Sequence, residues 1–70
     1  MREIKQMVRF WPGDIVRDSF GRMLRVLRFY ITVDPDIDEE PFTVYVCGRM
    51  VGPYREEEFG ERELMPGRKA

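Results

Sequence analysis

The chain has 70 residues, a net charge of −1 and a hydrophobic fraction of 43%. For this length we expect a single domain with only a thin core. One cysteine, Cys47, excludes an internal disulfide, and no apolar run reaches the length of a signal sequence or a membrane span. We therefore expect a cytoplasmic protein with no membrane partner.

The polar composition is biased toward charge. Asp, Glu, Lys and Arg make up 36% of the sequence, while Asn and His are absent and Gln occurs once. Few thermolabile amides and many charges indicate a thermophilic protein. Arg outnumbers Lys ten to two, which a GC-rich genome explains as well as a function does. Residues 1–33 carry a net charge of +4 and residues 34–70 one of −5, an asymmetry that can mark a nucleic-acid face or an acidic interaction face.

The N-terminal part of the chain predicts one strand between two turns. Residues 1–7 show no clear period, and we treat them as a tail or a short strand. Pro12-Gly13 predicts a turn, because Pro fixes φ and Gly accepts a positive φ, and residues 14–18 then alternate as a strand does. A second turn at residues 19–21 ends this strand.

The apolar run from Met23 to Val33 is compatible with two structures. A helical spacing of i, i+3, i+4 and i+7 relates Met23, Val26, Leu27 and Tyr30. A strand is favoured by the β-branched residues in this run, and by the lack of Glu or Gln three positions after Ser19, where a capping box would need one. We expect a strand, and a helix is the alternative for residues 22–31.

Residues 34–41 predict an acidic, solvated loop bounded by prolines. Its aspartates at positions 34, 36 and 38 repeat the spacing of the first three ligands of an EF-hand. The required Gly is Glu39, however, and the bidentate Glu is Tyr45, so we expect no metal site here.

The clearest strand signal is the strict alternation in residues 42–47. We expect one face of this strand to be core, namely Phe42, Val44 and Val46. The other face, Thr43, Tyr45 and a half-buried Cys47, is expected to point outward. Gly48-Arg49 is then expected to turn the chain.

The C-terminal third predicts an edge strand and a short final strand. Residues 54–59 contain three consecutive glutamates, and charge on an edge strand discourages pairing with other chains. Residues 60–66 predict a single 3₁₀ turn that leads into the last strand. We expect residues 67–70 to be a frayed tail.

Four to five short strands with regular turns indicate an all-β barrel or small sandwich. The chain resembles the small bacterial YodC-like proteins over residues 8–66, in the elements Phe10-x-x-Gly13-Asp14-Ile15-Val16-Arg17, Ser19-x-Gly21, Val44-x-Val46-Cys47, Glu58-Phe59 and Glu63-Leu64. It is similar, more loosely, to SH3-like barrels of the KOW and Tudor kind. The resemblance implies a small SH3-like barrel and no established activity. The sequence departs from the pattern after Cys47, where Gly48 and Arg49 replace an aromatic residue, and in its longer acidic loop.

Catalysis is the first function class that the composition argues against. With no His, one Ser and one Cys, the chain lacks the nucleophile and base of acyl transfer, and it has no Gly-rich phosphate loop before a helix. Carboxylates in a solvated loop have no reason to differ in pKa, as acid–base catalysis requires. We expect no enzyme, no cofactor and no small-molecule substrate.

Our main functional hypothesis is a protein-binding module, of the kind that a phage or mobile element encodes to modulate or inhibit a host protein. We expect it to act through a charged face and an exposed strand edge. A small barrel fills its interior with side chains and therefore binds on its surface, where Trp, Tyr and Arg often dominate interface energies. The candidate partner-binding residues are Trp11, Tyr30, Tyr54, Glu56, Glu57, Glu58 and Glu61. Trp11 is the expected anchor.

The alternative hypothesis is an RNA- or DNA-binding barrel. Basic residues interleaved with Phe and Tyr can contact phosphates while the rings stack on bases. The candidate nucleic-acid-binding residues are Arg17, Arg22, Arg25 and Arg28. The negative net charge argues against this alternative, because phosphate contacts dominate such affinity.

Overall fold

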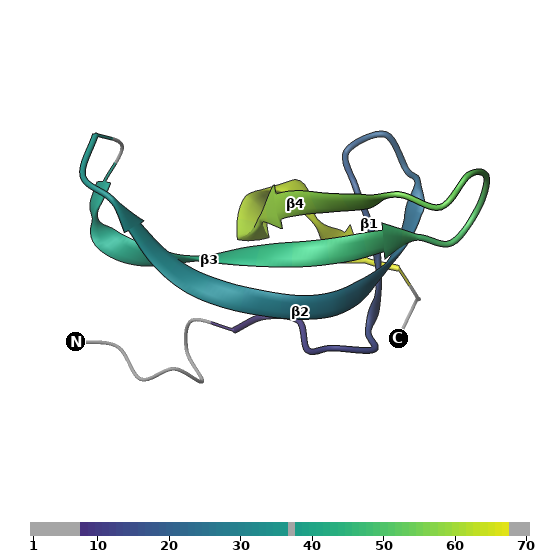
Figure 1. Ribbon diagram of the computed structural model, residues 1–70, viewed down its shortest axis with the longest axis horizontal. Coiled ribbons are helices and arrows are strands. Elements are labelled where there is room, and N and C mark those ends of the chain that lie inside the picture. Colours follow the sequence, from purple (N-terminus) through teal and green to yellow (C-terminus); the bar gives the residue numbers. More distant parts are fainter. Residues whose placement is uncertain (1–7, 37, 68–70) are drawn as a thin grey trace.

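The computed structural model describes residues 8–36 and 38–67, and the side chain of Asp38 is not among the parts described. They form five strands, β1 (Ile15–Arg17), β2 (Met23–Asp34), β3 (Asp38–Arg49), β4 (Glu56–Gly60) and β5 (Met65–Pro66). All pairings are antiparallel in one sheet of order β4-β3-β2-β1-β5 (Figure 1). The prediction of an all-β chain is confirmed. So is the 3₁₀ turn before the last strand, η1 (Glu61–Glu63).

The run from Met23 to Val33 is a strand, so the helical alternative is wrong. Its helix-like spacing has a local cause, a shift in the β2–β3 register between Val26 and Arg28. An extra residue in one strand, such as Leu27 here, resets the side-chain alternation. Buried Val26 and core-facing Phe29 are therefore three residues apart although both belong to a strand.

The β2–β3 connection is a tight hairpin, and the prediction of a long acidic loop is wrong. The turn occupies residues 35 and 36, and β3 already begins at Asp38. Pro41 is tolerated in β3 because β4 pairs with β3 only from Val44 onward, and the β2 pairing is irregular nearby. The hairpin therefore extends past the end of β4, toward the left of Figure 1.

Both ends of β1 carry the turns that the sequence predicts. Gly13 has φ of 97° and Gly21 has φ of 81°, conformations that a side chain would strain. The prediction that Gly48 and Arg49 turn the chain is wrong, because both residues continue β3. The turn follows at residues 50–53 instead.

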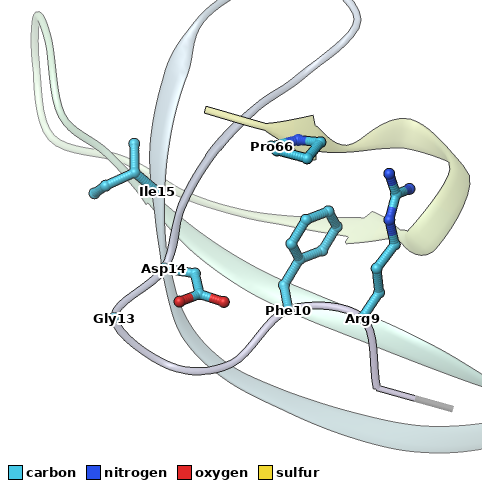
Figure 2. A pocket seen from close by; sticks show the side chains of 6 residues that line it. All are labelled: Arg9, Phe10, Gly13, Asp14, Ile15 and Pro66. Carbon is cyan, nitrogen blue, oxygen red and sulfur yellow. The ribbon is translucent and has the colours of Figure 1, made fainter. Parts of the chain in front are cut away.

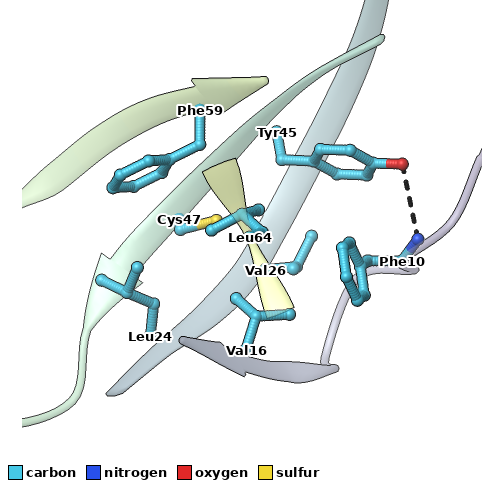
Figure 3. Packing of buried hydrophobic residues seen from close by; sticks show 8 residues of the cluster. All are labelled: Phe10, Val16, Leu24, Val26, Tyr45, Cys47, Phe59 and Leu64. Carbon is cyan, nitrogen blue, oxygen red and sulfur yellow. Dashed lines mark hydrogen bonds between the residues drawn. The ribbon is translucent and has the colours of Figure 1, made fainter. Parts of the chain in front are cut away.

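The core lies on one face of the curled sheet and draws on most of its elements (Figure 3). The buried cluster consists of Phe10, Val16, Leu24, Val26, Tyr45, Cys47, Phe59 and Leu64. The Tyr45 ring lies edge-on to Phe10, with centroids 5.6 Å apart. Its hydroxyl oxygen accepts hydrogen bonds from the backbone N–H groups of Arg9, at 2.8 Å, and Phe10, at 3.4 Å. Burying a tyrosine requires such partners, and the chain supplies them from a segment distant in sequence.

The predicted orientation of β3 is wrong. Tyr45 and Cys47 are 0% exposed, and Thr43 is also buried. Phe42 and Val44 lie on the opposite face and are half-buried, although Val46 on that face is buried as well. Alternation shows that a strand has two faces, but it does not show which one faces the core. Burial raises the pKa of the Cys47 thiol to about 11, so the thiol is protonated and is no nucleophile.

The predicted ends of the domain are only partly described. Residues 1–7, predicted as a tail or short strand, and residues 68–70 lie outside the described residues. Gly67, which the sequence assigns to the tail, is buried, and its N–H donates to the Ile15 carbonyl at 2.9 Å. Among the described residues, no helix is long and apolar enough to cross a membrane.

Candidate functional site

The face of the sheet opposite the core gathers exposed aromatic and charged side chains from β2 and β4. In the β2–β3–β4 register, Arg25, Gly48 and Glu56 lie in one row across the strands. The next rows pair Arg28 with Val46 and Glu58, and Tyr30 with Val44 and Gly60. We call this surface the outer patch and define it as Arg25, Arg28, Tyr30, Tyr54, Glu56 and Glu58.

Two hydrogen bonds and one ion pair connect the tyrosines, the glutamates and Arg28 of the outer patch. The Tyr30 hydroxyl donates to Glu58 Oε1 at 3.0 Å, and the Tyr54 hydroxyl donates to Glu56 Oε2 at 3.2 Å. Arg28 Nη1 lies 3.5 Å from Glu56 Oε1. The pKa of Tyr30 is raised, mainly by its bond to Glu58, and the pKa of Tyr54 is raised by desolvation and by Glu56. Both hydroxyls therefore remain neutral donors at physiological pH.

Tyr54 reaches the patch because β3 carries a glycine beneath it. A Cβ added to Gly48 would lie 3.0 Å from Tyr54 Cε1 and from the Tyr54 hydroxyl oxygen. A larger residue at position 48 would displace the Tyr54 ring. In the structure this ring covers the backbone at Gly48, which has no side chain to shield it. Tyr54 is still 67% exposed and Tyr30 is 42% exposed, so both rings are accessible on the surface.

The outer patch borders an edge of the sheet, as the run of glutamates predicted, because β4 is the terminal strand on this side. The Arg49 N–H donates to the Arg55 carbonyl at 3.0 Å, which makes these two residues a hydrogen-bonded pair. In an antiparallel ladder such pairs recur at every second residue. The backbone groups of Glu57 and Phe59 therefore face β3, and those of Glu56 and Glu58 face away from the sheet.

Glu57 and Arg22 lie apart from the outer patch, in an ion-pair network on the core side. Glu57 pairs with Cys47 across the strands, and its carboxylate lies 3.4 Å from Arg49 and 3.8 Å from Arg22. Arg22 also pairs with Asp18 at 2.6 Å. Glu57 Oε2 and Arg49 Nε have no hydrogen-bond partner among the described residues, so the network is not fully satisfied. We assign this network to stability.

Asp18, which sequence reasoning did not single out, organises the β1–β2 turn. Its buried carboxylate accepts backbone N–H groups from Phe20 and Arg22, both at 2.9 Å. Desolvation raises the pKa of Asp18, but these bonds and the Arg22 guanidinium outweigh it and lower the pKa below its ordinary value. Its sequence signal is the Asp-Ser-Phe-Gly turn, in which an Asp side chain commonly binds the backbone that follows.

The predicted partner-binding residues do not form one surface. Trp11 is 50% exposed but packs edge-on against Phe29, with centroids 5.7 Å apart, on the core side of the sheet. Tyr30 follows Phe29 in β2 and points to the other face. Glu61 is exposed in η1, beyond the end of β4. The structure therefore brings together Tyr30, Tyr54, Glu56 and Glu58 from that prediction.

The four predicted nucleic-acid-binding arginines are also divided. Alternation along β1 and β2, reset in β2 by the extra residue Leu27, places Arg17, Arg25 and Arg28 on the outer face. Arg22 instead pairs with Asp18 and Glu57. Arg17 Nε lies 3.3 Å from Met23 Sδ, and Arg28 is paired with Glu56. Positive charge on the outer face is thus interleaved with negative charge from β4.

A shallow groove lies where the segment before β1 comes close to Pro66 of β5 (Figure 2). Arg9, Phe10, Gly13, Asp14, Ile15 and Pro66 line it. The Arg9 guanidinium donates to the Leu64 carbonyl at 3.3 Å and lies 4.9 Å from the centre of the Phe10 ring. Asp14 Oδ2 accepts the Trp11 N–H at 2.9 Å. These bonds tie chain segments together, and we read the groove as structural.

The described residues contain no group of three or more His, Cys, Asp or Glu side chains that could hold a metal ion. No protein-family model, curated protein or solved structure matches the chain.

Proposed function

We propose that this chain is a non-enzymatic protein-binding module that recognises its partner through the outer patch and the adjoining edge of β4. One observation carries the proposal. Two exposed tyrosines, Tyr30 and Tyr54, are each hydrogen-bonded to a glutamate of an edge strand. Tyr is among the residues that most often dominate interface energies.

The outer-patch side chains are already oriented by their hydrogen bonds and ion pair, which favours binding. A partner that meets a surface whose rotamers are already fixed loses less side-chain entropy, which otherwise amounts to about 0.5–1.5 kcal/mol for each immobilised side chain. Glu56 holds both Tyr54 and Arg28, so one carboxylate fixes two candidate contact residues. Val46 lies between Arg28 and Glu58 in the sheet register and is buried, so it packs beneath the outer patch.

We further propose that the sheet is an SH3-like barrel, in keeping with the YodC-like resemblance. The support is its strand order together with a 3₁₀ turn before the last strand. Strands that are not neighbours in that order also share one core, because Val16 of β1 and Phe59 of the terminal strand β4 belong to the same buried cluster. Such a barrel fills its interior, so partners are met on the outside.

Affinity capture from a lysate of the source organism tests the proposed function. The immobilised parent is expected to capture a partner protein, and this partner should still be retained after treatment with nuclease. Tyr54→Ala should lose it, whereas Phe20→Ala, which removes an 82% exposed ring outside the patch, should retain it. Equal capture by both variants, or no nuclease-resistant capture by the parent, contradicts the proposal.

Nucleic-acid binding is the second candidate, because Arg17, Arg25 and Arg28 share the outer face with two exposed tyrosines. Glu56 and Glu58 offset part of this charge, which weakens the phosphate term. A heparin column separates the candidates. Flow-through at low salt supports a protein partner, and retention that falls steeply with salt supports nucleic acid.

A further inference from the structure

The edge of β4 has backbone hydrogen-bonding groups that the described chain does not use. The N–H and C=O groups of Glu56 and Glu58 point away from β3, as the Arg49–Arg55 pair fixes. No described residue bonds to these four groups, and no described strand lies beyond β4. The free edge ends at Gly60, whose N–H is 3.4 Å from Glu63 Oε1. Such an edge is a template for an additional strand.

Charge at this edge is negative on the outer face. The glutamates at positions 56 and 58 project there, and Tyr30 is the neutral donor to Glu58. Among the described residues, neither Glu58 nor the nearby Glu61 has a cation within ion-pair distance. A residue added opposite Glu58 would meet an unneutralised carboxylate, and opposite charges across strands are favourable.

The core side of the same edge favours a different kind of side chain in an added strand. There Glu57 is already surrounded by Arg22, Arg49 and Arg55, and Phe59 is 9% exposed. A cation added on this side would meet arginines, whereas an uncharged side chain would cover Phe59. The two faces of an incoming strand therefore need alternating basic and uncharged residues.

A second copy of this chain is a poor occupant of the edge. The antiparallel register that pairs the full length of β4 with itself places Glu58 opposite Glu58 and Glu57 opposite Phe59. Like charges directly opposite each other are destabilising. The glutamates thus oppose self-association while leaving the edge open to a basic strand.

We propose that the edge of β4 binds an extended segment of a partner protein that carries Lys or Arg at every second position, which adds to the sheet as a sixth strand. This inference rests on the function proposed above and specifies its mode. Main-chain hydrogen bonds to Glu56 and Glu58 supply affinity, and the alternating cations supply specificity.

The test uses the full chain and a synthetic peptide, Lys-Thr-Lys-Val-Lys-Thr-Lys, with blocked ends. Hydrogen exchange followed by NMR should show new protection of the Glu56 and Glu58 amides. The Glu57 and Phe59 amides, already paired with β3, should gain much less. Glu58→Lys should weaken binding about tenfold, since an attractive cross-strand pair becomes repulsive. The matched control Glu61→Lys makes the same charge change outside the edge and should weaken it less than twofold.

N-methylation of the peptide distinguishes strand addition from attraction between charges. Methyl groups on alternate residues remove the N–H groups that face β4 in one set and those that face solvent in the other. Methylation of the set that faces β4 should weaken binding by about tenfold or more, because backbone hydrogen bonds are lost. Methylation of the set that faces solvent should not weaken it. Equal effects of both sets, or a weakening by Glu61→Lys that matches Glu58→Lys, would overturn the inference.

The two proposals fail in different ways. If the peptide shifts the resonances of Tyr30 and Tyr54 without protecting the Glu56 and Glu58 amides, strand addition is wrong and the outer patch remains a protein-binding surface. If the parent captures no nuclease-resistant protein although the peptide gives the alternating protection, strand addition holds for the peptide and the proposed cellular function is wrong.

Discussion

The hydroxyl of Tyr45 is the most informative single group for the fold, because it joins β3 to the segment before β1. Tyr45→Phe keeps the ring and its contacts with Phe10 and Phe29, which lie 5.6 Å and 6.3 Å away between centroids. It removes the acceptor of the Arg9 and Phe10 N–H groups. Leaving a buried donor without a partner costs about 1–3 kcal/mol. For a domain of this size, each kcal/mol lowers the melting temperature by roughly 4–8 °C.

Urea unfolding at pH 7 measures this cost, and the dependence of the unfolding free energy on urea should not change. The matched control is Tyr30→Phe, which removes a hydroxyl bonded to Glu58 on the exposed face. This control should change the free energy of unfolding by less than about 0.5 kcal/mol, as most surface substitutions do. The account of the core is refuted if Tyr45→Phe is as stable as the parent, or if the two variants lose equal stability.

Three further outcomes follow from the structure and composition. Val44→Asp should retain the circular dichroism spectrum of the parent, because Val44 faces outward. Cys47→Asp should lose that spectrum, because Cys47 is 0% exposed. The reverse result would show that the opposite face of β3 points into the core. The lowered pKa of Asp18 means that its carboxylate stabilises the fold above its ordinary value of 3.8 and loses this effect as the pH falls below that value. Asp18→Asn should therefore be less stable than the parent at pH 7, and the difference in unfolding free energy should shrink as the pH falls below 3.8 in urea titrations, whereas a constant difference would contradict the argument. The scarcity of amides predicts a thermal midpoint above the mesophile range of about 45–65 °C, and a midpoint within or below that range contradicts it.

Local chemistry predicted several elements of this fold, but not the early start of β3 at Asp38 or its continuation through Gly48 and Arg49. The Pro12-Gly13 turn, the edge strand with three glutamates and the 3₁₀ turn depend on residues close together in the sequence. The orientation of β3 depends instead on a contact between residues far apart in the sequence. Tyr45 is buried because its hydroxyl reaches the backbone of residues 9 and 10, and no local pattern contains that contact.

The candidate site was predictable in composition but not in arrangement. Tyr30, Tyr54, Glu56 and Glu58 were chosen from residue type, and the sheet does bring them together, whereas Glu57 faces the core side. Trp11 was chosen on the same ground and lies elsewhere, since its position depends on a contact with Phe29. Gly48 was missed because its role is to leave space for Tyr54, which is visible only once the ring is placed.

Site-specific photocrosslinking tests most directly whether the outer patch is where a protein partner binds. Met50 lines a shallow groove together with Arg25 and Tyr54 of the outer patch. A photoreactive amino acid at position 50 would therefore lie beside the patch without replacing one of its residues. The control position is Phe20, which is more exposed and lies outside the patch. Irradiation in a lysate of the source organism should give a nuclease-resistant protein adduct at position 50 and none at position 20. Adducts of equal yield at both positions, or adducts at position 50 that nuclease removes, would contradict the account.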